Sequence, residues 1–344
     1  VTWDMARSNL HDSLKLKIIL EYDAVLGLGL DKIADSYEVS EDILNLVTQR
    51  SKLRDNGNYA EADSIRDNLD EIGYLLQDNL INTRVKPKSL WETRNKGNKI
   101  YSSPDEVDSF VDDRDVTDFT VALVACNYLD DVKRCLESVL RWIGNHHVEV
   151  LGLDNGSTDG TEQWLDNISA KDSRVRVIHT DHVLGEGAAK NILLKQSLGK
   201  YVVLLDTSVE AQGDFLSQIG MALSDQTIGV VGPWGLRTFD VQSFEEIDNG
   251  PSDAMQAYCF AVARESLRKV GLMRESFRFY RNLDIEFSFQ FLDRGYSILT
   301  LGMLPLVRHE HRVWTNMAQD VRDKLSADNF RRFHKRWGHR PDLI

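Results

Sequence analysis

The sequence predicts an α/β protein whose mainly parallel sheet is covered by helices on both faces, preceded by a small all-α helical bundle. From residue 119 on, short β-branched apolar runs alternate with amphipathic stretches across short loops. These runs are apolar throughout, which is typical of parallel strands buried on both faces. Before residue 86, apolar residues recur instead at the three- and four-residue spacing of helices.

The chain divides into four segments by texture. Residues 1–85 predict a helical bundle that includes two amphipathic helices joined by a turn at 56–58. Residues 86–118 are polar, charged and weakly periodic, which is typical of a linker. Residues 119–315 carry the α/β pattern, and 316–344 predict a basic helical extension.

Strands and helices alternate in order through the α/β segment. We expect four strands, at 116–126, 148–154, 175–180 and 200–206, with helices at 131–143, 157–168 and 187–199 between them. In parallel sheets of this kind, ligands bind beyond the carboxyl ends of the strands. The chemistry is therefore expected at residues 125–128, 154–158 and 206–208.

Composition narrows the classes of function. The chain has 344 residues, a net charge of −13 and three cysteines that form no C-x-x-C pair. The cysteine usage favours a reducing, cytoplasmic setting, and no apolar run is long enough to cross a membrane. The acidic charge argues against general nucleic-acid binding. Two basic stretches, 84–99 and 331–340, predict either solvated segments or contact with an anionic partner such as a lipid surface, a nucleic acid or a diphosphate.

The stretch LDNGSTDGTE places a carboxylate at the end of the second strand. There Asp154 is expected to accept hydrogen bonds from a nucleotide base or a ribose hydroxyl. Asn155 and Gly156 allow a sharp turn with positive φ, and the following helix start favours anionic groups. A purely structural strand–turn–helix corner is the alternative interpretation.

Two further stretches offer ligand contacts. LGEGAAKN resembles a phosphate-binding loop without matching an established pattern, and Lys190 is either a diphosphate contact or a solvated lysine. LLDTSVE ends the fourth strand with Asp206, but Ser208 stands where a metal-dependent transferase usually has a second acid. A hydroxyl is a weak ligand for a hard cation, so Glu210 is a further candidate if the strand continues.

The late part of the chain offers a base and an imidazole. In FYRNLDIEF, Asp284 and Glu286 lie near a helix start, where a carboxylate is either a general base within reach of an acceptor hydroxyl or a partner of the helix dipole. In VRHEHRVW, His309 and His311 offer one imidazole to a metal. Patterns typical of zinc sites are absent from the sequence.

Taken in order, these motifs resemble those of family 2 glycosyltransferases. The resemblance runs from about residue 120 to 314 and includes VALVACNYLDDVKRCLESVL, VEVLGLDNGSTDGT, GEGAAKNILLKQSLGKYVVLLD and FRFYRNLDIEFSFQFLDRGY. It implies a GT-A fold and inverting transfer of a sugar from a nucleotide-diphosphate donor, with UDP favoured over GDP. By similarity, the residues that line the nucleotide-sugar pocket are Ala125, Asn127, Asp154, Gly156, Ser157, Lys190 and Asp206.

The resemblance also implies the chemical roles. Asp284 takes the place of the base that deprotonates the acceptor, with Glu286 beside it, while Asp206 and His309 take the places of ligands to Mg²⁺ or Mn²⁺. Leu283 stands where the family usually has an acid before its base. A catalytically impaired scaffold that acts as a binding module is the alternative prediction.

The N-terminal part resembles a different family. LEYDAVLGLGL and RSKLRDNGNYAEADSIRDNLDEIGYLLQDNLINTRVK are similar to the C-terminal helical region of cysteinyl-tRNA synthetases. That resemblance implies a tRNA contact, for which Arg84, Lys86 and Lys88 would face the phosphates. Binding of another protein and packing on the transferase are the other interpretations of this segment.

Overall fold

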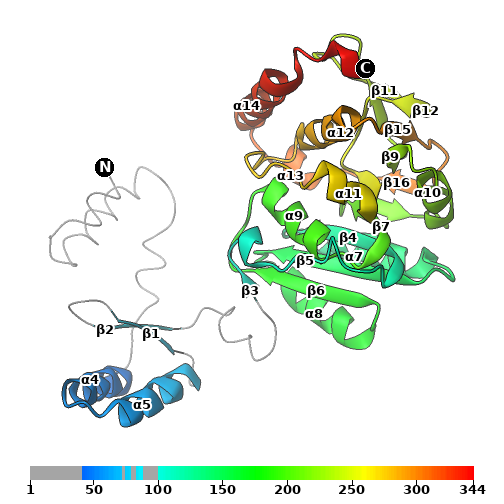
Figure 1. Ribbon diagram of the computed structural model, residues 1–344. Helices are drawn as coiled ribbons and strands as arrows, with labels where there is room; N and C mark the ends of the chain where they lie inside the picture. The colour runs from blue at the N-terminus through cyan, green and yellow to red at the C-terminus, as the bar shows by residue number, and fades with distance from the viewer. Residues whose placement is uncertain (1–40, 72–73, 79–82, 88–99) are drawn as a thin grey trace. The chain divides into compact units, whose positions relative to one another are not determined.

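The computed structural model describes residues 41–71, 74–78, 83–87 and 100–344 (Figure 1). The chain forms two compact units, residues 1–97 and 98–344. Much of the expected N-terminal bundle, residues 1–40, therefore lies outside the described residues. We describe each unit by itself.

In its described residues, the smaller unit combines two helices with a pair of antiparallel strands. Helices α4 (Glu41–Asp55) and α5 (Tyr59–Glu71) are joined by the expected turn, and strands β1 (Tyr74–Asp78) and β2 (Thr83–Pro87) pair antiparallel. The sequence predicted helices only up to residue 85. A short apolar run such as YLLQD fits a strand as well as a helix, so periodicity alone does not separate the two.

A nine-stranded, mainly parallel sheet forms the centre of the larger unit, as predicted. Its strand order is β12-β15-β9-β14-β7-β4-β5-β6-β3, with β14 and β12 antiparallel to their neighbours. The strands are β3 (Ile100–Tyr101), β4 (Thr117–Ala125), β5 (Val148–Asn155), β6 (Val175–Thr180), β7 (Gly199–Leu205), β9 (Ile228–Gly232), β12 (Gly250–Ser252), β14 (Cys259–Ala263) and β15 (Ser297–Thr300).

The larger unit also contains two smaller sheets. Strand β10 (Gly235–Arg237) pairs with β11 (Glu245–Ile247) and β13 (Ala254–Met255), and β8 (Val209–Ala211) pairs with β16 (Leu306–Arg308). The helices are α7 (Leu129–Trp142), α8 (Thr161–Lys171), α9 (Glu186–Gln196), α10 (Leu216–Leu223), α11 (Arg264–Val270), α12 (Leu283–Asp293), α13 (Arg312–Thr315) and α14 (Gln319–Trp337).

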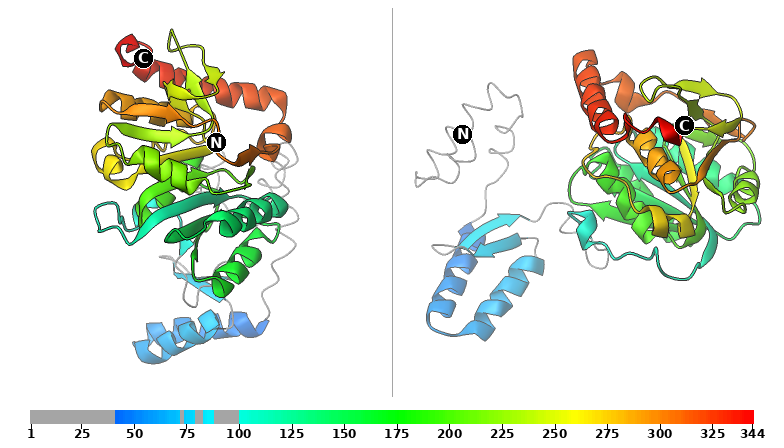
Figure 2. Two further views of the ribbon diagram at one scale, coloured as in Figure 1. Left: turned by 90° about the vertical axis from the view of Figure 1, so that its right-hand side faces the viewer. Right: turned by 45° about the horizontal axis from the view of Figure 1, so that its top comes forward.

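Helices lie on both faces of the sheet (Figures 1 and 2), and an apolar core packs against each face. On β4, Val121 and Leu123 face one core, to which α7, α8 and α10 contribute. Ala122 faces the other core, which α9, α12 and α14 cover. Because successive strand residues point to opposite faces, an uninterrupted apolar run is what a sheet covered on both sides requires.

Part of the segment expected as a linker belongs to the larger unit. Strand β3 pairs with β6, and the fully buried Arg264 fixes the chain between 110 and 115. Its guanidinium donates to the carbonyls of Phe110 and Asp113 and forms an ion pair with Asp115. These long-range contacts explain why weakly periodic residues are held in place.

The C-terminal extension is helical, as expected, and α14 packs on α12 through Phe289, Phe333 and Trp337. Within the described parts of the chain, helices are too short or too polar to cross a membrane.

We predict that Arg264→Lys lowers the free energy of unfolding by about 3 kcal/mol, because a buried ammonium cannot replace the forked guanidinium. Arg268→Lys is the matched control, since Arg268 also donates to Val111 and Asp113 but is 36% exposed. It should cost about 1 kcal/mol. Urea unfolding measures both, and equal losses would contradict the anchoring role of Arg264.

Candidate active site

Two carboxylates from distant parts of the chain are held together by one short backbone segment. Asp206 follows β7, and Asp284 lies in the first turn of α12. The Asp206 amide donates to the carbonyl of Tyr258 at 3.0 Å, and the Ala257 amide donates to Asp284 Oδ2 at 3.0 Å. Residues 256–258 therefore fix the two acids relative to each other.

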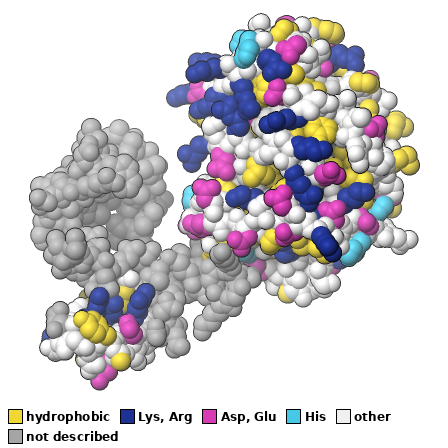
Figure 3. Space-filling view, in the orientation of Figure 1, with side chains coloured by type: hydrophobic (Ala, Val, Ile, Leu, Met, Phe, Trp, Pro, Cys, Tyr) yellow, Lys and Arg dark blue, Asp and Glu magenta, His cyan; other side chains and the backbone are white. Residues whose placement is uncertain are grey.

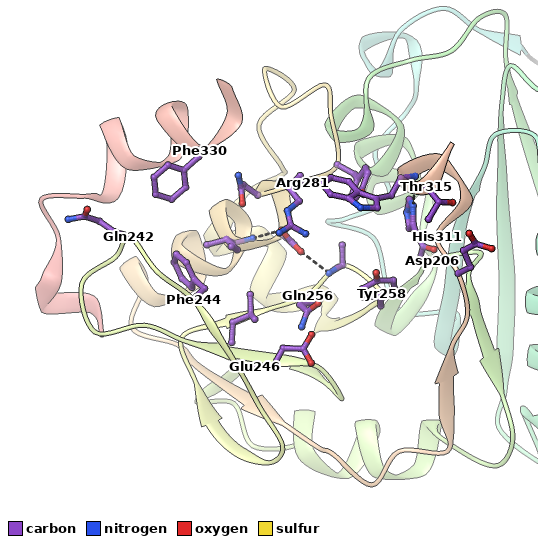
Figure 4. Close-up of a pocket in the computed structure, with 18 residues that line it drawn as sticks. Asp206, Gln242, Phe244, Glu246, Gln256, Tyr258, Arg281, His311, Thr315 and Phe330 are labelled. Carbon is purple, nitrogen blue, oxygen red and sulfur yellow. Dashed lines mark hydrogen bonds and ion pairs between the residues drawn. The ribbon is translucent and has the colours of Figure 1, made fainter. Parts of the chain in front are cut away.

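Both acids line one cleft made of two adjoining cavities. The larger has a volume of about 550 Å³, and the smaller, of about 90 Å³, lies at the ends of β4 and β7. Asp206, Tyr280 and His311 line both cavities, whereas Asp284 lines the larger. Figure 4 shows Asp206 and His311 side by side at one end of the larger cavity, with Phe330, Phe244 and Gln242 at the other.

Asp206 is held as an anion by its neighbours. Its Oδ1 accepts hydrogen bonds from the amide and the hydroxyl of Ser208, and its Oδ2 lies 3.5 Å from His311 Nε2. Burial alone would raise the pKa of Asp206, but the bonds from His311 and Ser208 outweigh it and lower the pKa to about 2. For His311, burial acts in the other direction and would lower its pKa. Pairing with Asp206 outweighs burial and raises the pKa of His311 above its usual value.

Aromatic rings fix the imidazole of His311. Tyr280 stacks on it with the ring centroids 4.5 Å apart, and Tyr258 meets it edge-on at 6.2 Å. Trp314 packs edge-on against Tyr280, and the guanidinium groups of Arg281 and Arg322 lie 5.1 and 4.8 Å from its ring centroid. This wall gives the cleft apolar faces beside its charged groups, as is typical of small-molecule sites.

Asp284 has the opposite electrostatic balance to Asp206. Burial raises its pKa, and this effect outweighs the backbone hydrogen bonds from Ala257 and Ile285 and the charges of Lys190 and Arg281, all of which lower it. A carboxylate with a raised pKa is a stronger base than an exposed one. The cleft thus contains one carboxylate that is difficult to protonate and one that accepts a proton more readily.

The LDNGSTDGTE corner lies at the same edge of the sheet but does not open into the cleft. Asp154 is fully buried, and its oxygens contact the Ser157 amide and His179 Nδ1, each at 3.2 Å. Ser157 Oγ in turn accepts from the Asn127 amide at 2.9 Å. Gly156 has the expected positive φ of 68°, and a Cβ there would lie 2.8 Å from the backbone of His182.

These contacts tie the end of β4 to the end of β5. Ala125, which pairs with Asp154, is fully buried, whereas Asn127 lines an open hollow that adjoins the smaller cavity through Tyr128 and Arg312. Of the residues expected around the nucleotide, the structure brings Asp206 and Lys190 to the cleft.

Lys190 lines the smaller cavity and forms an ion pair with Glu186, which lines it too. Its Nζ lies 3.0 Å from Glu186 Oε1 and its side chain is 10% exposed. Burial acts to lower the pKa of Lys190, but the charge and hydrogen bond of Glu186 raise it, so the ammonium is retained.

The glycines before Lys190 accommodate a crossing backbone. The amides of Glu186 and Gly187 donate to the carbonyls of Arg278 and Phe277, so both are already used. A Cβ on Gly187 would lie 2.7 Å from the Arg274 carbonyl oxygen. The likeness of LGEGAAKN to a phosphate loop therefore has a structural cause.

Two residues assigned chemical roles by resemblance lie elsewhere. His309 Nε2 contacts Glu210 Oε2 at 2.7 Å, and His311 is the imidazole beside Asp206. Glu286 is fully buried and paired with Arg336 at 2.8 Å. The His-x-His spacing indicated both histidines without separating them, whereas nothing local indicated Tyr258, Tyr280 or Trp314.

Over the described residues, three or more His, Cys, Asp or Glu side chains do not gather into a metal site. Asp206 and His311 nevertheless provide one carboxylate oxygen and one imidazole nitrogen at a shared position. Both are ordinary ligands of a divalent cation. The Ser208 hydroxyl donates to Asp206 and holds that carboxylate in place.

Comparison with known proteins identifies the class. The structure resembles that of GalNAc-T7 with UDP, GalNAc and Mn²⁺, with a TM-score of 0.54 and 15% identity over 66% of this chain and 50% of that one. The larger unit therefore has the GT-A-like α/β fold. Residues 120–282 match the family described as Glycosyl transferase family 2. This stretch of the larger unit is therefore similar to family 2 glycosyltransferases.

Curated relatives agree with this family. An uncharacterized glycosyltransferase of Haemophilus influenzae is 24% identical over 53% of this chain and 79% of its own length. Succinoglycan biosynthesis protein ExoO of Rhizobium meliloti is 29% identical over 50% of this chain and 51% of its own length. The family match begins at residue 120, so the synthetase-like character of residues 1–85 stays a prediction.

We predict that His311→Gln destabilises the protein more at pH 5.5 than at pH 8.5 in metal-free buffer. Because the pKa of His311 is raised on folding, its pairing stabilises the fold fully below the unfolded pKa of about 6.5 and is lost as the pH rises through the folded value. Urea unfolding at both pH values measures the difference.

A double-mutant cycle isolates the Asp206 pair in this experiment. In an Asp206→Asn background, His311→Gln should show little of the extra destabilisation at pH 5.5. The same pH dependence in both backgrounds would contradict the pairing.

Proposed function

We propose that the protein is an inverting glycosyltransferase in which Asp284 is the general base for the acceptor hydroxyl. The observation that supports this most directly is the shared anchoring of Asp206 and Asp284 by residues 256–258 in one cleft. Inverting transfer is an in-line displacement, so it needs a base on one face of the sugar and stabilisation of the leaving group on the other. Two carboxylates with different electrostatic surroundings suit these two tasks.

Asp284 removes the proton from the acceptor hydroxyl as its oxygen bonds to the anomeric carbon. The bond from that carbon to the donor diphosphate breaks, and the diphosphate leaves with the electron pair. Burial raises the pKa of Asp284 towards the range in which general bases are most effective. Backbone amides hold both of its oxygens, which aims the carboxylate without a side-chain partner.

We propose a nucleotide-diphosphate sugar as donor, with UDP favoured over GDP. The smaller cavity presents Lys190 and Arg312. Burial acts to lower the pKa of Lys190, but Glu186 raises it, so its ammonium charge is retained. Fixed positive groups of this kind stabilise a departing diphosphate.

Mg²⁺ or Mn²⁺ is the cofactor we propose at this end of the cleft. Asp206 and His311 would hold the ion, and the donor diphosphate and water would complete its shell. When bound, the cation would supply further charge to the leaving diphosphate.

We predict that Asp284→Asn lowers kcat for sugar transfer roughly 10³-fold, because the amide cannot accept the proton. Asp293→Asn, at the other end of α12, is the matched control and should stay within about twofold of wild type, since its one ion pair among the described residues is a surface pair with Arg340. Donor turnover with UDP- and GDP-sugars and Mn²⁺ measures both. A binding module would show no turnover in any of these proteins.

The effect of Mn²⁺ on UDP binding tests whether His311 or His309 is the metal ligand. With Mn²⁺ present, His311→Ala should weaken UDP binding about tenfold, whereas His309→Ala should leave it unchanged. Calorimetric titration with UDP, with and without Mn²⁺, provides the measurement. Loss of the Mn²⁺ effect in the His309 variant alone would move the proposed ligand to that residue.

A further inference from the structure

A basic groove lies on the larger unit outside the cleft. It is an open hollow of about 650 Å³ between α14 and the segment before α12, lined by Arg274, Ser276, Arg332, Lys335 and Arg336. Figure 3 shows Lys and Arg side chains gathered at the upper left of this unit, where Figure 1 places α14. We call these five residues the basic groove. Its charge contrasts with the net charge of −13 for the whole chain.

A buried carboxylate organises one wall of the basic groove. Glu286 is fully buried, and its Oε1 lies 2.8 Å from Arg336 Nη1 and 3.8 Å from Arg274 Nη1. Its Oε2 accepts from Gln290 at 2.7 Å. Glu286 thus positions two guanidinium groups, while the side chains of Arg274 and Arg336 remain 42% and 40% exposed.

The other cations of the groove keep their charge available. Among the residues that the structure describes, Lys335 has no ion pair, and Arg332 donates to the neutral amide oxygen of Asn329 at 2.9 Å. One buried carboxylate therefore stands against four cationic side chains. Grooves with uncompensated, forked donors bind phosphate oxygens through charge-assisted hydrogen bonds.

The basic groove and the cleft are both bordered by α14 and by residues 274–282. Asn329 donates to the carbonyls of Phe279 and Arg281, and Asn282 donates to that of Ser326, so residues 274–282 follow α14. Phe330 and Arg281 line the larger cavity. Phe330 and Arg336 are six residues apart on α14, which is roughly 9 Å along the helix and about 120° around it, so the larger cavity and the basic groove lie on different sides of α14.

We propose that the basic groove binds the phosphate group of an anionic ligand, as a site separate from the cleft. Its three guanidinium groups and one ammonium group offer charge and forked donors to phosphate oxygens. A long nucleic acid fits less well, because the acidic surface elsewhere would repel it.

The test compares two double variants that remove the same charge from α14. Arg332→Gln/Lys335→Gln empties the groove of two cations, and Lys324→Gln/Arg331→Gln removes two exposed cations outside it. The probe is inorganic tripolyphosphate, titrated calorimetrically into the full chain without divalent cations. We expect binding to the groove variant to be roughly tenfold weaker than to wild type, and binding to the control to be unchanged.

Three results would overturn the proposal: no binding of tripolyphosphate to wild type, equal weakening in both double variants, or binding only to vesicles of phosphatidylcholine with one-fifth phosphatidylserine. The last result would make the groove a membrane contact.

Donor binding keeps the two proposals apart, because the groove variant should bind UDP with wild-type affinity. A wild-type chain that binds tripolyphosphate in the groove but no UDP- or GDP-sugar would contradict the proposed function and support the groove as a phosphate site.

Discussion

The site depends on the antiparallel pairing of β14 with β7. This pairing carries the chain past the end of β7, where the Tyr258 carbonyl accepts from the Asp206 amide and the Ala257 amide reaches Asp284. Two acids separated by 77 intervening residues are thereby joined through the main chain of residues 257 and 258. At Asp206 the hydrogen bond is made by the backbone amide, whereas at Asp284 it is made by the side-chain carboxylate.

Much of the fold follows from local pattern. Unbroken apolar runs with short connections require a sheet covered on both faces, and the carboxyl ends of its strands mark the edge that holds Asp206. The anchoring of residues 110–115 by Arg264 depends on contacts between distant residues. Local periodicity contains no information on such contacts. For this reason the linker expected at 86–118 includes residues that belong to the larger unit, which begins at residue 98.

Side-chain direction limited the prediction of the site. Asp284 and Glu286 are two residues apart on a helix, which turns them about 200° from each other, so one faces the cleft and the other the protein interior. His309 and His311 differ in their partners, because the pairing of β8 with β16 brings Glu210 to the first of them. In both cases the sequence indicates two candidate residues, and tertiary contacts decide which of the two faces the cleft.

The glycines before Lys190 have a consequence for how such junctions are interpreted. Gly185 and Gly187 leave room for residues 274–278 to cross over the start of α9, and that crossing occupies the amides a phosphate would use. In proteins of this architecture, several glycines at a strand–helix corner can be required because two main chains cross there at van der Waals distance. Counting the unoccupied N–H groups is then a better guide to anion recognition than matching a glycine pattern.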